Sequence, residues 1–222
     1  MRVWLLVCAG LISGASCSGC QKKTEVSANT AEGFWQWVAG SETGLANGVM
    51  GTDPAHTMQA LTERIKAVNP GLIAEVAIDR STGAQQTLVI SAAGNSALFP
   101  AVKALVASAP ALARFKVVAF RQRRLQQDDS IEVEGKSYST KDFFYRELDR
   151  LEGKLDIEIL VKGLTAENNE TMTRLAFVLL DAAVGEYDVE TKLGGVTLVA
   201  MPAEVPEAAK PLQRVAEAVD SL

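Results

Sequence analysis

The chain has little of the side-chain chemistry that most enzymes use. Its 222 residues include one histidine, and all three cysteines lie within the first twenty positions. A thiol nucleophile, an internal disulfide and a conventional zinc site are therefore excluded for residues 21–222. His56 stands between Ala55 and Thr57, and no serine or acid pattern points to it. We expect it to be an exposed residue at a helix start rather than part of a catalytic triad.

Long apolar segments, phosphate-binding loops and an excess of positive charge are also missing. The apolar run at residues 3–12 has about half of the ~20 residues that a membrane-spanning helix needs. Gly194 and Gly195 indicate a turn, because no glycine-rich loop of the nucleotide-binding kind follows a strand. The formal net charge is −5, which argues against a nucleic-acid partner. The sequence predicts no cofactor.

The first twenty residues have the pattern of an export signal. Met1 and Arg2 form a short positive region, residues 3–12 an apolar segment, and residues 13–19 a stretch of small residues. The end of this region resembles the lipobox of bacterial lipoproteins, in which an apolar residue and two small ones precede a cysteine that receives a lipid. An ordinary cleaved signal with incidental cysteines is the alternative interpretation.

Two cysteines compete as the lipidated residue. Cys20 follows Ser18 and Gly19, which suit the small positions, although Cys17 occupies the place where leucine is usual. Cys17 lies closer to the apolar segment, but there Gly14 occupies that place. We favour Cys20. The residue after either cysteine, Gln21 or Ser18, is not aspartate, and the resemblance to lipoproteins of diderm bacteria then implies the periplasmic face of the outer membrane in a diderm host.

We expect three regions: a signal peptide over 1–19, a lipid-anchored flexible tether over 20–30, and a single folded domain over 31–222. Helical periodicity and caps predict helices over 32–39, 54–68, 96–108 and 166–184, and a weak one over 206–222. Asp53 is the expected cap of the second helix and Thr165 that of the fourth, which Gly185 should end with a left-handed residue.

Apolar and β-branched segments predict strands over 72–78, 87–91, 115–120 and 196–201. Hairpins are expected from 130–134 with 136–139, and from 143–151 with 154–162, although 143–151 also contains adequate helix formers. The predicted fold is α+β, with a mixed, mainly antiparallel sheet and helices packed on it.

The best local group of functional side chains is the acidic run that follows the fourth helix. If residues 186–191 are extended, Glu186, Asp188 and Glu190 share one face about 7 Å apart. They would then bind a hard divalent cation, or pair with Arg121 and Arg123 from the strand that begins at 115. We expect arginine pairing rather than a catalytic or metal-binding role.

Several short runs also resemble a family of uncharacterised bacterial proteins. They are GEYDVET at 185–191 after an apolar helix ending in Leu-Leu-Asp, LVISAAGN at 88–95, FPAV at 99–102 and AFRQRR at 119–124. The resemblance spans about 34–202 in the same order. It implies a family, and it implies no activity, ligand or catalytic residue.

Two classes of function fit these observations. The favoured one is a non-catalytic binding or interaction domain anchored to the lipid bilayer of the cell envelope, whose partner is an envelope protein or a small ligand. Such a domain predicts an exposed aromatic patch near Trp35, Trp37 or Tyr138, whereas core packing is the ordinary role of tryptophan. The alternative is a carboxylate-dependent hydrolase or cation-binding protein that uses the 186/188/190 acids, with Arg121 or Arg123 assisting.

Overall fold

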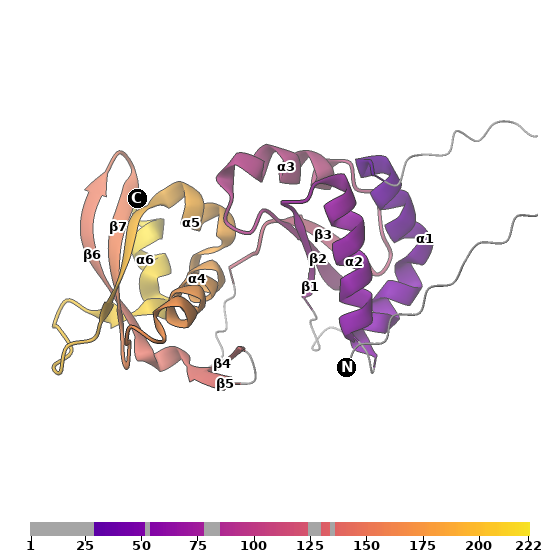
Figure 1. Ribbon diagram of the computed structural model, residues 1–222. Helices are drawn as coiled ribbons and strands as arrows, with labels where there is room; N and C mark the ends of the chain where they lie inside the picture. Colours follow the sequence, from indigo (N-terminus) through magenta and orange to yellow (C-terminus); the bar gives the residue numbers. More distant parts are fainter. Residues whose placement is uncertain (1–28, 52–53, 78–84, 124–129, 134–135) are drawn as a thin grey trace, which may run out of the picture.

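The structure is a computed structural model that describes residues 29–51, 54–77, 85–123, 130–133 and 136–222 (Figure 1). Cys17, Cys20, the signal region and almost all of the tether lie outside these residues, as does the expected cap Asp53. Two lobes lie side by side, each with its own hydrophobic cluster. No helix in the described part of the chain is both long enough and apolar enough to cross a bilayer.

The N-terminal lobe is a three-stranded sheet with helices on one of its faces. In chain order its elements are α1 (Ala31–Met50), α2 (Pro54–Val68), β1 (Ile73–Ala77), β2 (Gln86–Ser91), η1 (Ser96–Leu98), α3 (Phe99–Ala107) and β3 (Phe115–Ala119). Strand β2 is central, antiparallel to β1 and parallel to β3. The lobe's cluster joins Leu88 and Ile90 of β2 to Phe34, Leu61 and Val102 of the three helices.

Helix α1 is much longer than predicted. Thr30 caps it by accepting a hydrogen bond from the Gly33 N–H at 3.0 Å, and the helix then continues to Met50. The prediction that glycines would end it near residue 39 is wrong, because the second half packs against α2 and buries Leu45 and Val49. This burial outweighs the low helix propensity of glycine, which costs about 1 kcal/mol relative to alanine at each position.

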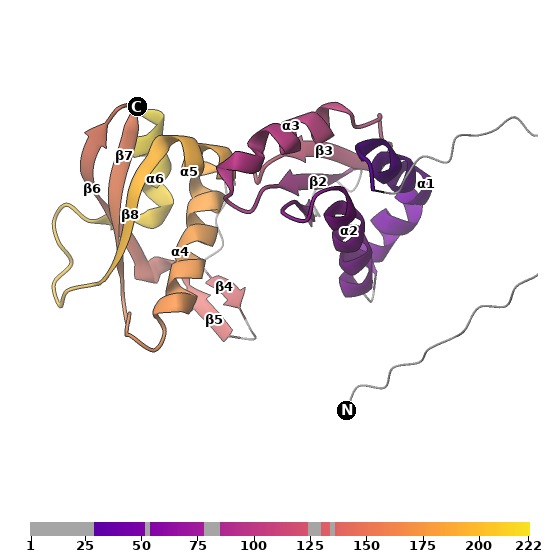
Figure 2. The ribbon, with the colours of Figure 1, turned by 45° about the horizontal axis from the view of Figure 1, so that its top comes forward.

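The C-terminal lobe places helices α4 and α6 on one face of a four-stranded sheet (Figure 2). In chain order its elements are β4 (Ser130–Val133), β5 (Lys136–Ser139), η2 (Thr140–Asp142), β6 (Phe143–Leu151), β7 (Lys154–Val161), α4 (Asn169–Val184), α5 (Glu186–Lys192), β8 (Leu193–Ala200), β9 (Lys210–Pro211), η3 (Leu212–Arg214) and α6 (Val215–Asp220). The sheet order is β8-β7-β6-β9, with only β7 and β8 parallel, and β4 and β5 form a separate hairpin.

The predicted fold class is confirmed: the chain is a single α+β unit with mixed sheets and helices packed on them. Its strands divide between separate sheets. The second helix and both hairpins lie where the sequence placed them, and the helical alternative for 143–151 is wrong because β6 pairs with β7.

Two helix boundaries differ from expectation. Thr165 does not cap α4, which begins at Asn169 after a turn in which Thr165 and Asn168 bond to each other. The predicted terminal helix is reduced to α6, since Lys210 and Pro211 pair as β9 with β6.

Candidate functional site

The acidic run after α4 is a short helix, not a strand. Residues Glu186–Lys192 form α5, with two acids in its first turn and a basic residue in its last. The expectation that Glu186, Asp188 and Glu190 share one face is therefore wrong, because helical geometry turns successive residues by about 100°. The signals for a helix are the acidic first turn and the Asp188–Lys192 ion pair at i,i+4 spacing, 3.1 Å long.

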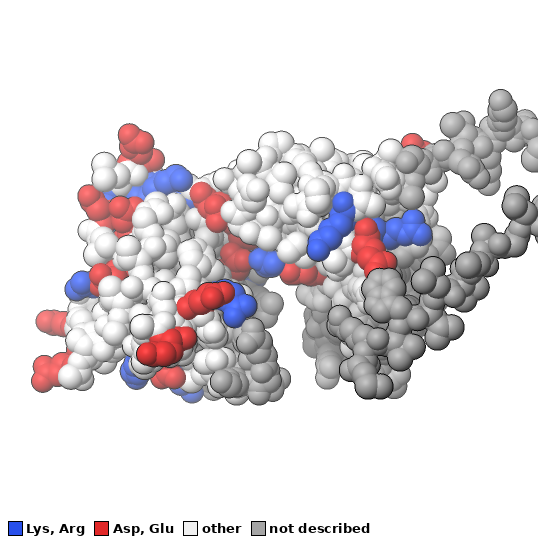
Figure 3. All heavy atoms as spheres, in the orientation of Figure 1, with Lys and Arg blue, Asp and Glu red and all other residues white. Residues whose placement is uncertain are grey.

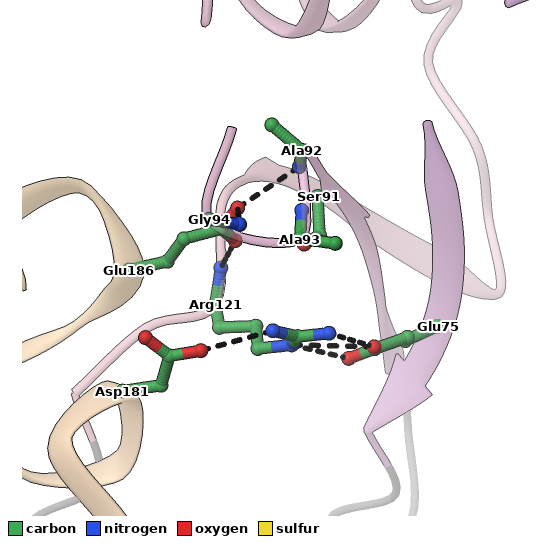
Figure 4. A network of polar contacts seen from close by, with 8 residues as sticks. All are labelled: Glu75, Ser91, Ala92, Ala93, Gly94, Arg121, Asp181 and Glu186. Carbon is green, nitrogen blue, oxygen red and sulfur yellow. Dashed lines mark hydrogen bonds and ion pairs between the residues drawn. The ribbon is translucent and has the colours of Figure 1, made fainter. Parts of the chain in front are cut away.

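Glu186 is buried at the junction of the two lobes, with no exposed surface. Its Oε1 accepts hydrogen bonds from the backbone N–H groups of Ala92 at 2.9 Å and Gly94 at 3.3 Å, and its Oε2 accepts one from the Arg121 N–H at 3.1 Å (Figure 4). The Glu186 N–H in turn donates to the Arg121 carbonyl at 3.0 Å. The carboxylate therefore ties the loop after β2 and the end of β3 to the start of α5.

The backbone around this carboxylate is shaped to receive it. Ala93 and Gly94 both have positive φ, at 51° and 78°, which turns neighbouring N–H groups into a concave arrangement suited to an anion. Gly185 has φ 94°, and a Cβ there would lie 3.4 Å from the Arg123 nitrogen and 3.5 Å from the Arg121 oxygen. The expected positive φ at Gly185 is thus confirmed. Both distances are of ordinary van der Waals length, so the backbone conformation rather than a lack of space favours glycine there.

Arg121 joins two carboxylates from different lobes. Its guanidinium donates through Nε and Nη2 to Glu75 of β1, with a shortest distance of 2.6 Å, and through Nη1 to Asp181 of α4 at 2.9 Å (Figure 4). These contacts raise the pKa of Arg121. The pKa of Asp181 is raised, chiefly by burial, although the Arg121 guanidinium acts to lower it. The predicted pairing of Arg121 with the 186/188/190 acids is wrong, because its guanidinium pairs with Glu75 and Asp181, which the sequence did not single out.

The other predicted residues lie around this junction without joining it. Arg123 forms a two-pronged ion pair with Asp220 near the C-terminus, at 2.7 and 2.8 Å. Glu190 is half-buried, and desolvation, together with repulsion from Asp181 and Glu186, raises its pKa. Of the five candidate residues, only Glu186 and Arg121 bond to each other, through the Arg121 backbone, and the five do not form one site. Among the described residues, no group of three histidine, cysteine, aspartate or glutamate side chains is arranged to hold a metal ion.

Next to the junction, an open cleft of about 690 Å³ lies between the two lobes. Figure 3 shows the molecule hollowed between its lobes, with charged side chains gathered at the junction above the hollow. One wall is the face of the β1-β2-β3 sheet that the helices of its own lobe leave uncovered. It is formed by Glu75, Ala77, Thr87, Val89, Lys116 and Val118.

Strand alternation explains this wall. In β2, Leu88 and Ile90 point into the N-terminal core, so Thr87 and Val89 point into the cleft. Lys116 and Val118 of β3 alternate in the same way. The opposite wall is the exposed side of α4, with Val178, Asp181 and Ala182, and the segment Arg121 to Arg123 closes the end near the junction. The sequence prediction missed this cleft because it needs both lobes.

Trp35 and Trp37, the tryptophans that the structure describes, do not form an exposed binding patch. Trp35 is buried in the N-terminal core, where its indole N–H donates to the Leu105 carbonyl at 2.9 Å, and Trp37 is half-buried under Arg64. Tyr138 packs against the C-terminal core. Core packing, the preferred prediction for the tryptophans, is thus confirmed for Trp35. His56 is exposed in the first turn of α2, as predicted.

Models of known protein families give no match to this chain, and neither do the curated proteins. Three of the four short runs quoted from the sequence meet in space: the loop after β2, the end of β3 and the start of α5 are the segments that Glu186 connects. The functional assignment therefore depends on the geometry of the junction and the cleft.

Proposed function

We propose that the protein is a lipoprotein of the bacterial cell envelope whose folded part binds a small ligand in the cleft between its lobes without catalysing a reaction. The observation that carries the binding role is the open sheet face, where Val89 and Val118 face α4 across the cleft. Ligand sites of this volume commonly combine apolar walls with a few polar groups.

The absence of a catalytic role is supported by how the junction uses its charged groups. The Glu186 carboxylate accepts three backbone hydrogen bonds, and the Arg121 guanidinium is shared between Glu75 and Asp181. A general base or an electrophile needs a side chain that is free to meet a substrate. A hydrolase or cation-binding protein built on the 186/188/190 acids therefore has less support than a binding protein.

The envelope location is supported by the residues before the folded part. The apolar segment at 3–12, the small residues before Cys20 and the polar stretch that follows fit an acylated N-terminus on a tether. The residue after Cys20 is Gln21, which in a diderm host favours the periplasmic face of the outer membrane. In this proposal the acyl chains hold the protein at the membrane, and the cleft faces the aqueous side.

The anchor is tested by replacing Cys17 and Cys20 with alanine, singly and together, in a diderm host fed an alkyne-bearing palmitate. We expect Cys20→Ala and the double variant to lose the acyl label and to leave the membrane fraction, whereas Cys17→Ala keeps both. Loss on Cys17→Ala alone would move the lipid to Cys17. Retention of label and membrane fraction in all three variants would contradict the anchor.

The cleft is tested by filling it. Ala182→Trp places an indole between the sheet face and α4, whereas Glu170→Trp adds the same group to an exposed first-turn position of the same helix, outside the cleft. In a thermal-shift screen of small molecules, we expect compounds that raise the melting temperature of the wild type and of Glu170→Trp to lose at least tenfold in affinity for Ala182→Trp. Equal binding to all three proteins would place the ligand elsewhere.

A further inference from the structure

The charges that line the cleft differ in whether they already have partners. Glu75, Arg121 and Asp181 form one closed group at the junction end, and Arg123 is paired with Asp220. Lys116 forms no ion pair with any described residue, and its side chain is exposed at the cleft. Among the described residues that line the cleft, Lys116 is therefore the one cation without an ion-pair partner.

The register of the sheet places this charge at a defined distance from the junction. Glu75, Val89 and Val118 lie in one row across the three strands, and the next row away from the junction contains Thr87 opposite Lys116. Neighbouring strands are about 4.8 Å apart, so the Thr87 hydroxyl and the Lys116 ammonium lie within reach of one small polar group.

Between the closed ion group and this polar row, the cleft is apolar. Val89 and Val118 of the sheet face Val178 and Ala182 of α4. Val178 is 49 % exposed, although it lies on the side of α4 that faces the cleft. Val89 is already buried at 6 % exposure and Val118 is half-buried, so an apolar molecule placed here would mainly remove the surface of Val178 and Val118 from water, which is favourable by about 25 cal/mol per Å².

From this order of groups we infer that the cleft binds an amphipathic acid with a single carboxylate, such as a medium-chain fatty acid, its chain against the three valines and its carboxylate on Lys116 and Thr87. This inference rests on the proposed binding role of the cleft. A single lysine with a neighbouring hydroxyl matches a monoanion, whereas a phosphate dianion is commonly held by several charged donors or by arginine forks.

The experiment uses the acylated protein in phosphatidylcholine nanodiscs and octanoate that carries a photoreactive diazirine in its chain. The labelled residues are located by mass spectrometry, and octanoate, 1-octanol and octylamine are added as competitors. We expect saturable labelling of β2, β3 and α4 residues of the cleft, with octanoate competing at least tenfold better than the alcohol or the amine.

Three variants at exposed positions separate charge from shape. Lys116→Met should weaken octanoate about tenfold and leave 1-octanol unchanged, because it removes one charge-assisted contact worth about 1.5 kcal/mol. Lys116→Arg should retain binding, and Lys66→Met on α2 serves as the control for loss of an exposed lysine outside the cleft.

The possible failures are distinguishable. If 1-octanol competes as well as octanoate, or if Lys116→Met changes nothing, the acid is the wrong ligand class and the binding role of the cleft stands. If neither the diazirine acid nor an equivalent diazirine alcohol labels the cleft, both the ligand class and the binding role are overturned.

Discussion

Replacing Glu186 with alanine is expected to lower the free energy of unfolding by about 3 kcal/mol, measured by urea denaturation. The carboxylate is the acceptor for the backbone N–H groups of Ala92, Gly94 and Arg121, and all of them lie where the two lobes meet. A buried donor left without an acceptor costs about 1–3 kcal/mol, and water entering the space recovers part of that loss.

Two further substitutions test whether the charge or only the shape matters. Glu186→Gln keeps the length of the side chain, but its amide has one acceptor oxygen and an NH₂ group that would face a backbone N–H, so we expect an intermediate loss. Asp188→Asn is the matched control on the same helix. Its i,i+4 ion pair with Lys192 is partly exposed, so the expected change is within about 0.5 kcal/mol.

Amide hydrogen exchange gives a local readout of the same contacts. In Glu186→Ala, the amides of Ala92 and Gly94 should lose protection more than amides in β7, which lie in the interior of the C-terminal lobe. If Glu186→Ala and Asp188→Asn have the same free energy of unfolding, or if amide exchange rises equally in both lobes, then the Glu186 carboxylate does not hold the junction together.

The contrast between Glu186 and Asp188 also shows what the sequence could predict. Local patterns identified the hairpin of β6 and β7 and the end of α4 at Gly185, because these depend on neighbouring residues. The shared face of the acids depended on the assumption that 186–191 is extended, whereas the i,i+4 spacing of Asp188 and Lys192 indicated a helix. Seven residues were too few for periodicity alone to decide between the two.

The junction depends on contacts that one sequence does not encode locally. Arg121 bonds to Glu75, 46 positions away, and to Asp181, 60 positions away. Acidic side chains on the outward face of a strand or helix are common. Nothing in the sequence therefore singled out Glu75 or Asp181 as partners of Arg121. The cleft was missed for the same reason, because its two walls come from segments far apart in the sequence.

Arg121→Met is expected to destabilise the protein by about 2–3 kcal/mol at neutral pH, less than a fully buried pair would cost because Glu75 is 37 % exposed. The methionine fills a similar volume but leaves Glu75 and Asp181 as unpaired like charges. Arg121→Lys should recover only part of the loss, since one ammonium lacks the planar fork that reaches both carboxylates. Arg123→Met is the control, with an expected loss within about 1 kcal/mol, because Asp220 is 54 % exposed.

The loss of stability caused by Arg121→Met should increase as the pH rises. Burial already raises the pKa of Asp181 above its ordinary 3.8, and removing the guanidinium takes away the contact that lowers it. A carboxyl group whose pKa is raised in the folded state contributes stability when the pH is below its ordinary pKa. This contribution is lost as the pH rises through the folded-state pKa. The difference in free energy of unfolding between wild type and variant should therefore be smallest near pH 4 and complete at pH 7.

Adding Asp181→Asn to Arg121→Met should restore most of the stability at pH 7, because the remaining carboxylate of Glu75 is partly solvated and no longer faces a second charge. A deficit that is independent of pH, or one that the second substitution does not reduce, would show that Arg121 acts through packing rather than by neutralising the two acids.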